Sequence, residues 1–212
     1  MTLRIRPMDW NVLLFFIPAG AVLAVAPGPN NLLAVNHGAR YGLNRALMAG
    51  LGRLLAFTLM IAITAVGLGA ALATSEVAFQ VIKWGGAAYL AYLGIRTFLA
   101  KSEAVDEATV GKQATLFRQM RSEFIVAAGN PKAILIFTAF FPQFIKPDLP
   151  FVSQFFVLGV VFLIMEFFAL GLYAAAGKQV ARLIRTSKGM KWMNRVSGSA
   201  LFSAGVALAV SK

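Results

Sequence analysis

A single acidic residue, Glu166, lies inside a long apolar stretch of this chain. It occupies the run FLIMEFF, with no other charge nearby in the sequence. Apolar surroundings favour the neutral, protonated carboxyl, which makes Glu166 a candidate proton carrier. The same carboxylate is equally a candidate for binding a substrate ammonium group. The plainer alternative is a carboxyl that stays protonated or hydrogen-bonded for packing alone.

Two basic residues, Lys132 and Arg53, also fall within apolar stretches. A lysine deep in a membrane span costs about 2.5–3.5 kcal/mol on insertion scales, so Lys132 must face a cavity, bind an anion or snorkel to the interface. Arg53 lies a turn or two inside its stretch. A snorkelling interfacial arginine is the simpler interpretation, and a gating partner for a carboxylate is the sharper one. His37 falls where its stretch ends, and a lone histidine there is more often incidental than functional.

Residues that break helices interrupt the first apolar stretch at APGPNN, residues 26–31. Pro27 and Pro29 flank Gly28, and this arrangement predicts an unwound segment. Pro29 suits the first turn of a new helix, whose unpaired N–H groups and positive dipole end would point into the interior. Asn30 and Asn31 add amide donors and acceptors, so the segment suits a carboxylate. The alternative is a proline kink packed against neighbouring helices.

A second interruption, GNPK at residues 129–132, contains similar residues in a different order. Gly129 permits unusual backbone dihedrals, Asn130 can cap the half-helix that follows, and Pro131 again suits its first turn. Interrupted helices survive in a bilayer only where protein or a polar cavity surrounds them, and matched interruptions in two halves point to a transporter's binding site. We therefore take both interruptions as the candidate substrate site, with Lys132 as a further member.

The composition requires a membrane protein. The 212 residues are 59% hydrophobic with a mean hydropathy of +0.74, and the whole length corresponds to one transmembrane domain, residues 1–212. Cysteine is absent, and there are one histidine and eight acids, so we expect no metal site, no cofactor and no enzyme active site. The net charge of +12 is better explained by basic cytoplasmic loops than by nucleic-acid binding. The small-residue motif AVA at 24–26 imitates a signal-peptide cleavage site, but we expect a retained first span.

Apolar stretches predict an all-α polytopic protein of about six transmembrane helices. The expected spans are about 10–37, 43–74, 77–99, 123–144, 151–176 and 195–210. A polar linker at about 100–121 separates a first repeat, about 10–99, from a second, about 122–210. Each repeat holds three spans and begins with a broken one. Because three is an odd number, the second repeat is inverted relative to the first.

Lysine and arginine set the expected orientation. One side of the six-span arrangement collects thirteen of them and the other side five. The richer side should be cytoplasmic, which places both termini outside and lipid around the bundle. The small residues Ser199, Ser203 and Ala207 give the sixth span a face for close packing, either within one chain or across a homodimer.

Three motifs resemble the LysE/RhtB family of amino-acid exporters. The opening APGPNN followed by GARYG at 38–42 resembles that family's first signature, and GGAAYLAYLG at 85–94 resembles its third span. GNPK at 129–132 followed by FFPQF at 140–144 resembles that family's fourth span. The similarity covers nearly the whole chain, in order.

The resemblance implies an exporter of amino acids or close derivatives in a prokaryotic inner membrane, driven by the proton gradient. Arg53 departs from the family, which usually has a small or apolar residue there, and this makes a cationic substrate less favoured. Substrate would then lie between the two interruptions, with its carboxylate toward Asn30 and Lys132 and its ammonium, or the counter-moving proton, on Glu166. A cation or metal exporter, and a membrane protein that transports nothing, are the alternatives.

Overall fold

The computed structural model describes residues 9–74, 115–146, 149–177, 179–180 and 186–210, with scattered residues between 77 and 99. The secondary structure of these residues is helical, and the all-α prediction is confirmed. The elements are α1 (Asn11–Val25), α2 (Pro29–Tyr41), α3 (Leu43–Thr74), α5 (Leu116–Ala128), α6 (Pro131–Leu135), the π-helical turn η1 (Ile136–Phe140), the 3₁₀ turn η2 (Phe141–Phe144), α7 (Phe151–Ala175) and α9 (Ser187–Val210).

Both predicted interruptions divide a span into two helices. The axes of α1 and α2 meet at 60°, and those of α5 and the helical segment Pro131–Phe144 meet at 54°. Pro29 and Pro131 each occupy the first turn of the second half, as predicted, and the Asn130 side chain caps α6 by accepting from the Lys132 N–H at 3.0 Å. The expectation for Gly129 is wrong, because its φ of −91° is open to any residue.

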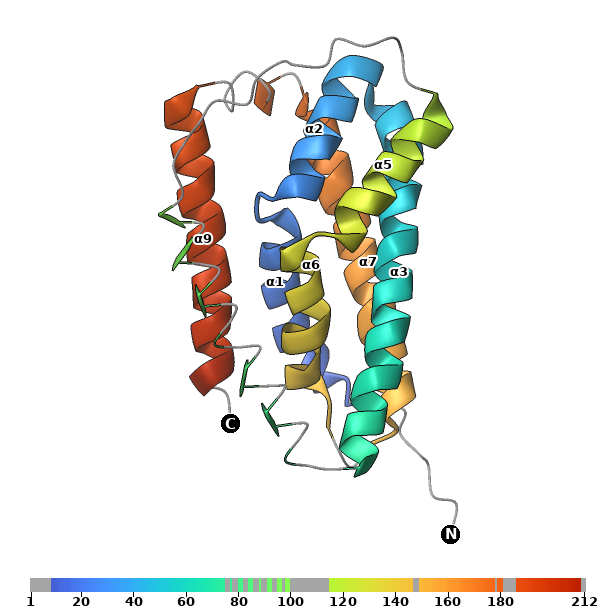
Figure 1. Cartoon of the computed structure of the whole chain (residues 1–212), viewed down its shortest axis with the longest axis vertical. Helices are drawn as coiled ribbons and strands as arrows, with labels where there is room; N and C mark the ends of the chain where they lie inside the picture. The colour runs from blue at the N-terminus through green and yellow to red at the C-terminus, as the bar shows by residue number, and fades with distance from the viewer. Residues whose placement is uncertain are drawn as a thin grey trace.

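The two broken spans run in opposite directions through the bundle. In Figure 1, α1 and α2 rise from the end that holds the start of the described chain, whereas α5 and α6 descend from the other end. The long helices α3 and α7 are likewise antiparallel, and α9 ends on the same side as α1 begins. Opposite directions are what an inverted repeat requires. The repeat boundaries stay a prediction, since residues 100–114 of the linker lie outside the described part.

Hydropathy located the apolar helices better than the polar ones. The second and fifth expected spans match α3 and α7 almost residue for residue, and α3, α7 and the two bent pairs give up to four candidate membrane crossings among the described residues. The fourth span starts earlier than predicted, at Leu116, because Thr115 caps a polar first turn. The sixth starts earlier too, at Ser187. Much of the third, including Tyr89, lies outside the described residues.

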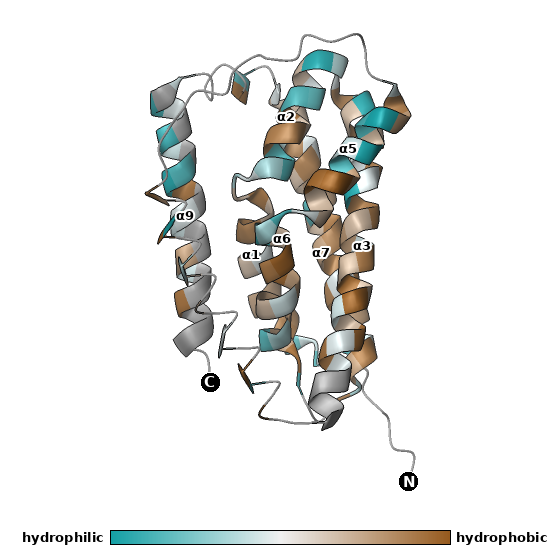
Figure 2. Ribbon diagram, viewed as in Figure 1, coloured by the Kyte–Doolittle hydropathy of each residue, from teal (hydrophilic) through white to brown (hydrophobic). Residues whose placement is uncertain are grey.

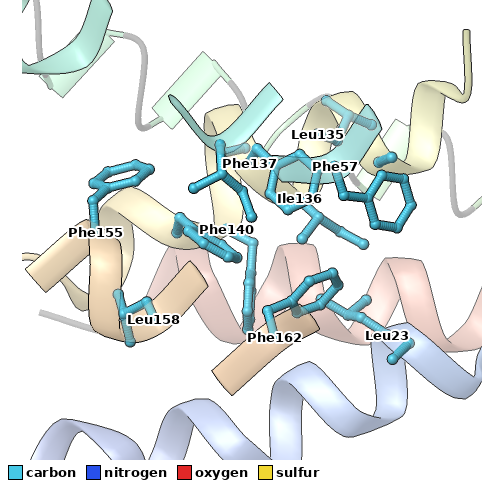
Figure 3. Close-up of a cluster of buried hydrophobic side chains, with 14 of the residues drawn as sticks. Leu23, Phe57, Leu135, Ile136, Phe137, Phe140, Phe155, Leu158 and Phe162 are labelled. Carbon is cyan, nitrogen blue, oxygen red and sulfur yellow. The ribbon is translucent and has the colours of Figure 1, made fainter. Parts of the chain in front are cut away.

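A cluster of buried apolar side chains, rich in phenylalanine, packs inside the bundle (Figure 3). Phe137 of η1 is fully buried, and its ring centroid lies 5.4 Å from Phe57 of α3, 5.2 Å from Phe141 and 5.6 Å from Phe162 of α7. Each of these contacts is edge-to-face, which adds about 0.5–1.5 kcal/mol beyond area burial. The cluster therefore fixes the second half of the broken span against both long helices.

The outer faces of the bundle carry large apolar side chains. Leu14, Phe15, Ile63, Val66 and Phe168 are each more than two-thirds exposed. Figure 2 shows apolar residues along the lengths of α1, α3 and α6, and hydrophilic residues gathered at the ends of α2 and α5 that face the same side. Large apolar side chains exposed on several helices are what a surface covered by lipid requires.

The opposite end of the bundle is tied by polar contacts. Asp9, just before α1, pairs with Lys146, and hydrogen bonding to that ammonium holds the pKa of the Asp9 carboxyl below its usual range. Gln154 of α7 is buried and donates to the carbonyl oxygens of Lys146 and Leu149 at 2.9 and 3.1 Å. These bonds anchor the connection into α7 against the start of α1.

Helices α3 and α5 meet at a glycine next to Arg53. A Cβ added to Gly52 would lie 2.0 Å from the main-chain oxygen of Met120, and backbone cannot yield as a flexible side chain can. A similar contact joins α2 to α7, where a Cβ on Gly38 would lie 2.0 Å from the Ala174 oxygen. Gly52 thus permits the close approach that brings the next turn of α5 within reach of Arg53.

Gly52→Ala should therefore lower thermal stability in detergent, by about 1–3 kcal/mol, since the added methyl separates α3 from α5. Gly67→Ala is the matched control, because nothing lies within 4 Å of a Cβ added at that position of the same helix. That control should be neutral or stabilising. Equal stability of the two variants would show that α3 and α5 do not require this contact.

Candidate functional site

Arg53 lies at the centre of the molecule with no solvent exposure. Its Nε and Nη2 donate to Oε2 of Glu123 at 3.0 and 2.9 Å, and its Nη1 donates to Oε1 of Glu166 at 3.1 Å. The same Nη1 lies 3.2 Å from Oδ1 of Asn31, and Nη2 also donates to the main-chain oxygen of Asn30. One guanidinium therefore binds residues of α2, α5 and α7. The simpler prediction, a snorkelling arginine, is wrong because these partners keep the side chain inside.

The first interruption supplies two asparagines with different roles. Asn31 is buried, and its Nδ2 donates to the main-chain oxygens of Ala24 and Ala26 at 2.9 and 3.0 Å. These carbonyls lose helical partners where α1 ends, so Asn31 satisfies them across the break. Asn30 accepts a hydrogen bond at its Oδ1 from Nδ2 of Asn130, while its own Nδ2 is buried with no hydrogen bond to the residues that the structure describes. The two interruptions thus touch each other directly.

Lys132 closes the other side of the first interruption. Its Nζ donates to the main-chain oxygens of Leu23 and Ala26 at 3.0 and 2.8 Å. A cation at a helix C-terminus is stabilised by the dipole of that helix, here α1. A Cβ added to Gly28 would lie 3.5 Å from the Lys132 Nζ, an ordinary contact distance, so the lysine side chain packs over this glycine. Lys132 is thereby held inside the protein rather than snorkelling to the interface.

Charges in the site balance. Arg53 and Lys132 contribute two positive charges, and Glu123 and Glu166 contribute two negative ones, when all four groups are ionised. Arg53 contacts both carboxylates at hydrogen-bonding distance, whereas Lys132 contacts carbonyl oxygens. A buried charge is tolerated only when it is paired and hydrogen-bonded, and Arg53 satisfies both conditions.

His37 extends the network toward the polar end of the bundle. It is buried, and its Nδ1 lies 3.2 Å from Oε1 of Glu123, although the two atoms are not aligned as a hydrogen bond. His37 also lines a hollow of about 160 Å³. Its lining is Asn36, His37, Arg40, Tyr41, Arg118, Gln119 and Ser122.

The structure brings together most of the residues that the sequence singled out. Asn30, Asn31, Asn130, Lys132, Arg53 and Glu166 all join the network described above. The other predicted site residues shape the backbone of the two interruptions: Pro27, Gly28, Pro29, Gly129 and Pro131. Proline and glycine side chains have no hydrogen-bonding groups, so these residues add no side-chain bond to the network. Among the described residues, no group of three or more histidine or acidic side chains could hold a metal ion.

Sequence reasoning missed Glu123 and His37. The sequence predicts only the start of a span at residue 123 and an incidental histidine at 37, yet Glu123 is buried against Arg53 and His37 is buried against Glu123. A usable signal lay in α5, where the buried Gln119, Glu123 and Ala127 recur every four residues while Phe117 and Ile125 are exposed. When a helix turns its apolar side chains outward to lipid, its polar stripe must face the interior.

Comparison with known proteins decides the family. Residues 21–212 match the family described as LysE type translocator. The chain belongs to the LysE type translocator family. This translocator is 32% identical to an uncharacterized membrane protein of Vibrio cholerae over 97% of its own length and 100% of the relative's. It is also 32% identical to proteins of Salmonella typhi and Salmonella typhimurium named homoserine/homoserine lactone efflux protein, over 93% of its own length and 95% of theirs. No solved structure matches it.

Lys132→Met should destabilise the translocator by about 1.5–3 kcal/mol. The main-chain oxygen of Leu23 loses its charged hydrogen-bond donor, and that of Ala26 keeps only its bond from Asn31. Lys132→Arg retains N–H donors and a positive charge, so it should restore much of that loss. Thermal unfolding of the purified protein in detergent measures both. A methionine variant as stable as the native protein would mean that Lys132 does not hold α1 in place.

Proposed function

We propose that this translocator exports amino acids or close derivatives by exchange for protons. The observation that supports this most strongly is the buried pair of Arg53 and Glu166, 3.1 Å apart, where the two interrupted spans meet. Intramembrane charges mark transport pathways, and interrupted helices mark binding sites. The two homoserine/homoserine lactone efflux proteins match this chain over nearly its full length. This similarity supports a small neutral amino acid as the substrate class.

The Arg53–Glu166 pair suits a zwitterion. A substrate carboxylate can replace Glu166 on the arginine fork, and the released Glu166 can bind the substrate ammonium group. The total charge of the site does not change when a zwitterion enters, so no buried charge is left unpaired. A cationic substrate would add an uncompensated charge beside Arg53 and Lys132, and is therefore disfavoured.

Competition for Glu166 would couple the substrate to the proton. When Glu166 takes up a proton, it loses its attraction for both Arg53 and an ammonium group, so substrate binding and protonation oppose each other. Opposed binding at one site is the requirement for antiport. Arginine stays charged throughout, so protons are carried by the carboxylates and not by the guanidinium.

We place the translocator in the cytoplasmic membrane of a prokaryote. The end of the bundle that holds Arg40 of α2 and Arg118 of α5, here called the arginine-rich end, would lie in the cytoplasm. Both termini then lie outside, and the bilayer surrounds the exposed apolar faces. Alternating access would rock one three-helix repeat against the other around Arg53. Homodimerisation through α9 stays a prediction.

A cation or metal exporter is the second candidate, and the position of Arg53 disfavours it. Glu123 and Glu166 converge on a guanidinium, which occupies the place where their oxygens would otherwise hold a cation. A membrane protein that transports nothing would have no use for a charged pair at matched helix breaks.

Efflux of labelled homoserine from preloaded vesicles tests the proposal. Native protein should export it, and the rate should fall when the proton gradient is collapsed. Glu166→Gln should abolish the dependence on the gradient, because the amide cannot carry a proton. Asp9→Asn makes the same chemical change at a surface pair and should leave efflux unchanged. Gradient-independent efflux by the native protein, or normal pH dependence in the glutamine variant, would overturn the coupling.

A further inference from the structure

We propose that His37 and Glu123 form the site where the coupling proton is exchanged with the arginine-rich end of the bundle. The inference rests on the proposed proton-coupled export and assigns to these residues one of its two proton exchanges, the exchange at the arginine-rich end. It adds to Glu166 a second carboxylate of the same machinery. Glu123 touches Arg53 on one side and His37 on the other, and these contacts place it between the substrate site and the hollow.

The two oxygens of Glu123 face different partners. Oε2 accepts both hydrogen bonds from Arg53, and Oε1 has no hydrogen bond among the described residues but lies 3.2 Å from Nδ1 of His37. Both Oε1 and Nδ1 are buried polar atoms without a bonded partner, a costly arrangement in a native protein. A small rotation of the imidazole would align a proton between them. A proton could then pass between Nδ1 of His37 and Oε1 of Glu123.

His37 separates Glu123 from water. Glu123 has no exposure, whereas His37 lines the hollow of about 160 Å³ and is 6% exposed. In the transfer step, Nε2 of the imidazole takes a proton from hydronium, which becomes water, while the N–H bond at Nδ1 breaks and an O–H bond forms at Oε1 of Glu123. One proton enters and one is passed on, so His37 returns to a neutral ring. Release toward the hollow is the reverse of this step.

Charged groups act on His37 in opposite directions. Glu123 of α5 attracts a proton to the ring, and Glu166 of α7 does so from farther away, beyond Arg53. The cations that oppose it are Arg40 of the same helix, Arg45 and Arg53 of α3, and Arg118 of α5; the ring of Tyr41 also lies 6.1 Å away. His37 is therefore placed between one contacting carboxylate and several arginines.

Protonation of Glu123 would change substrate binding through Arg53. The guanidinium is shared by two carboxylates, so a proton on Glu123 weakens its hold and strengthens the bond of Arg53 to Glu166. Stronger pairing with Glu166 would expel the substrate zwitterion from between them. Loss of that proton to the arginine-rich end would reverse both changes, so proton release there would be linked to substrate binding.

Transport by reconstituted His37→Asn tests this assignment, with labelled homoserine as the probe. Asparagine places an amide N–H near the position of Nδ1 but cannot titrate, so it keeps a structural hydrogen bond and removes only proton transfer. Two rates are measured: exchange of internal for external homoserine, which needs no net proton movement, and net efflux driven by the proton gradient, recorded from about pH 5 to 8. Glu123→Gln is the second variant, and Asp9→Asn is the control.

His37→Asn should exchange homoserine at the native rate but lose at least about tenfold in gradient-driven efflux, with a flattened pH profile. Retention of the native pH profile and driven rate would overturn the assignment, as would an equal loss of exchange and driven efflux, which marks a structural residue. Glu123→Gln is permanently neutral and binds Arg53 less strongly, so it should lose exchange as well as gradient-driven efflux. Native exchange by this variant would show that the protonation state of Glu123 does not act on the substrate site. Failure of the native protein to move homoserine in either assay would instead refute the proposed function.

Discussion

A charged guanidinium in a water-free interior must be neutralised and fully hydrogen-bonded, and the arrangement around Arg53 follows from that requirement. Two carboxylates, a side-chain amide and a main-chain carbonyl satisfy it, and they come from three different helices. Removing Arg53 would leave two buried carboxylates without their cation, at a cost of about 3–5 kcal/mol. The requirement ties α2, α3, α5 and α7 to one point, where the two interrupted spans also meet.

Interrupted helices need the same polar partners that a transport site needs. The end of α1 exposes carbonyl oxygens in the interior, and these are bound by Asn31 and Lys132. The polar side chains that make the break tolerable are therefore the ones available to a substrate once the pairs open. Glycine contacts at Gly38 and Gly52 bring the helices close enough for these bonds, and the buried apolar cluster around Phe137 fixes the second half of the broken span.

The sequence predicted the parts of this structure that depend on local chemistry. Prolines at 29 and 131 located the starts of the second half-helices, and apolar length located α3 and α7. It did not predict that Arg53 pairs with Glu123 and Glu166, which are 70 and 113 residues away in the chain. Pairing at such separations depends on how the helices pack, and no local pattern records it. Hydropathy also assigns a charged residue near a span end to the interface, and this misplaced both Arg53 and Glu123.

The most direct measurement is a mutant cycle on the shared guanidinium, read as thermal unfolding in detergent. Arg53→Met leaves two buried carboxylates without their cation, while the triple variant Arg53→Met, Glu123→Gln, Glu166→Gln removes the charges together. The account predicts a large destabilisation for the single change, about 3–5 kcal/mol, and recovery of much of it in the triple variant. A triple variant destabilised by the sum of its three single changes would contradict the claim that Arg53 and the two carboxylates act as one unit.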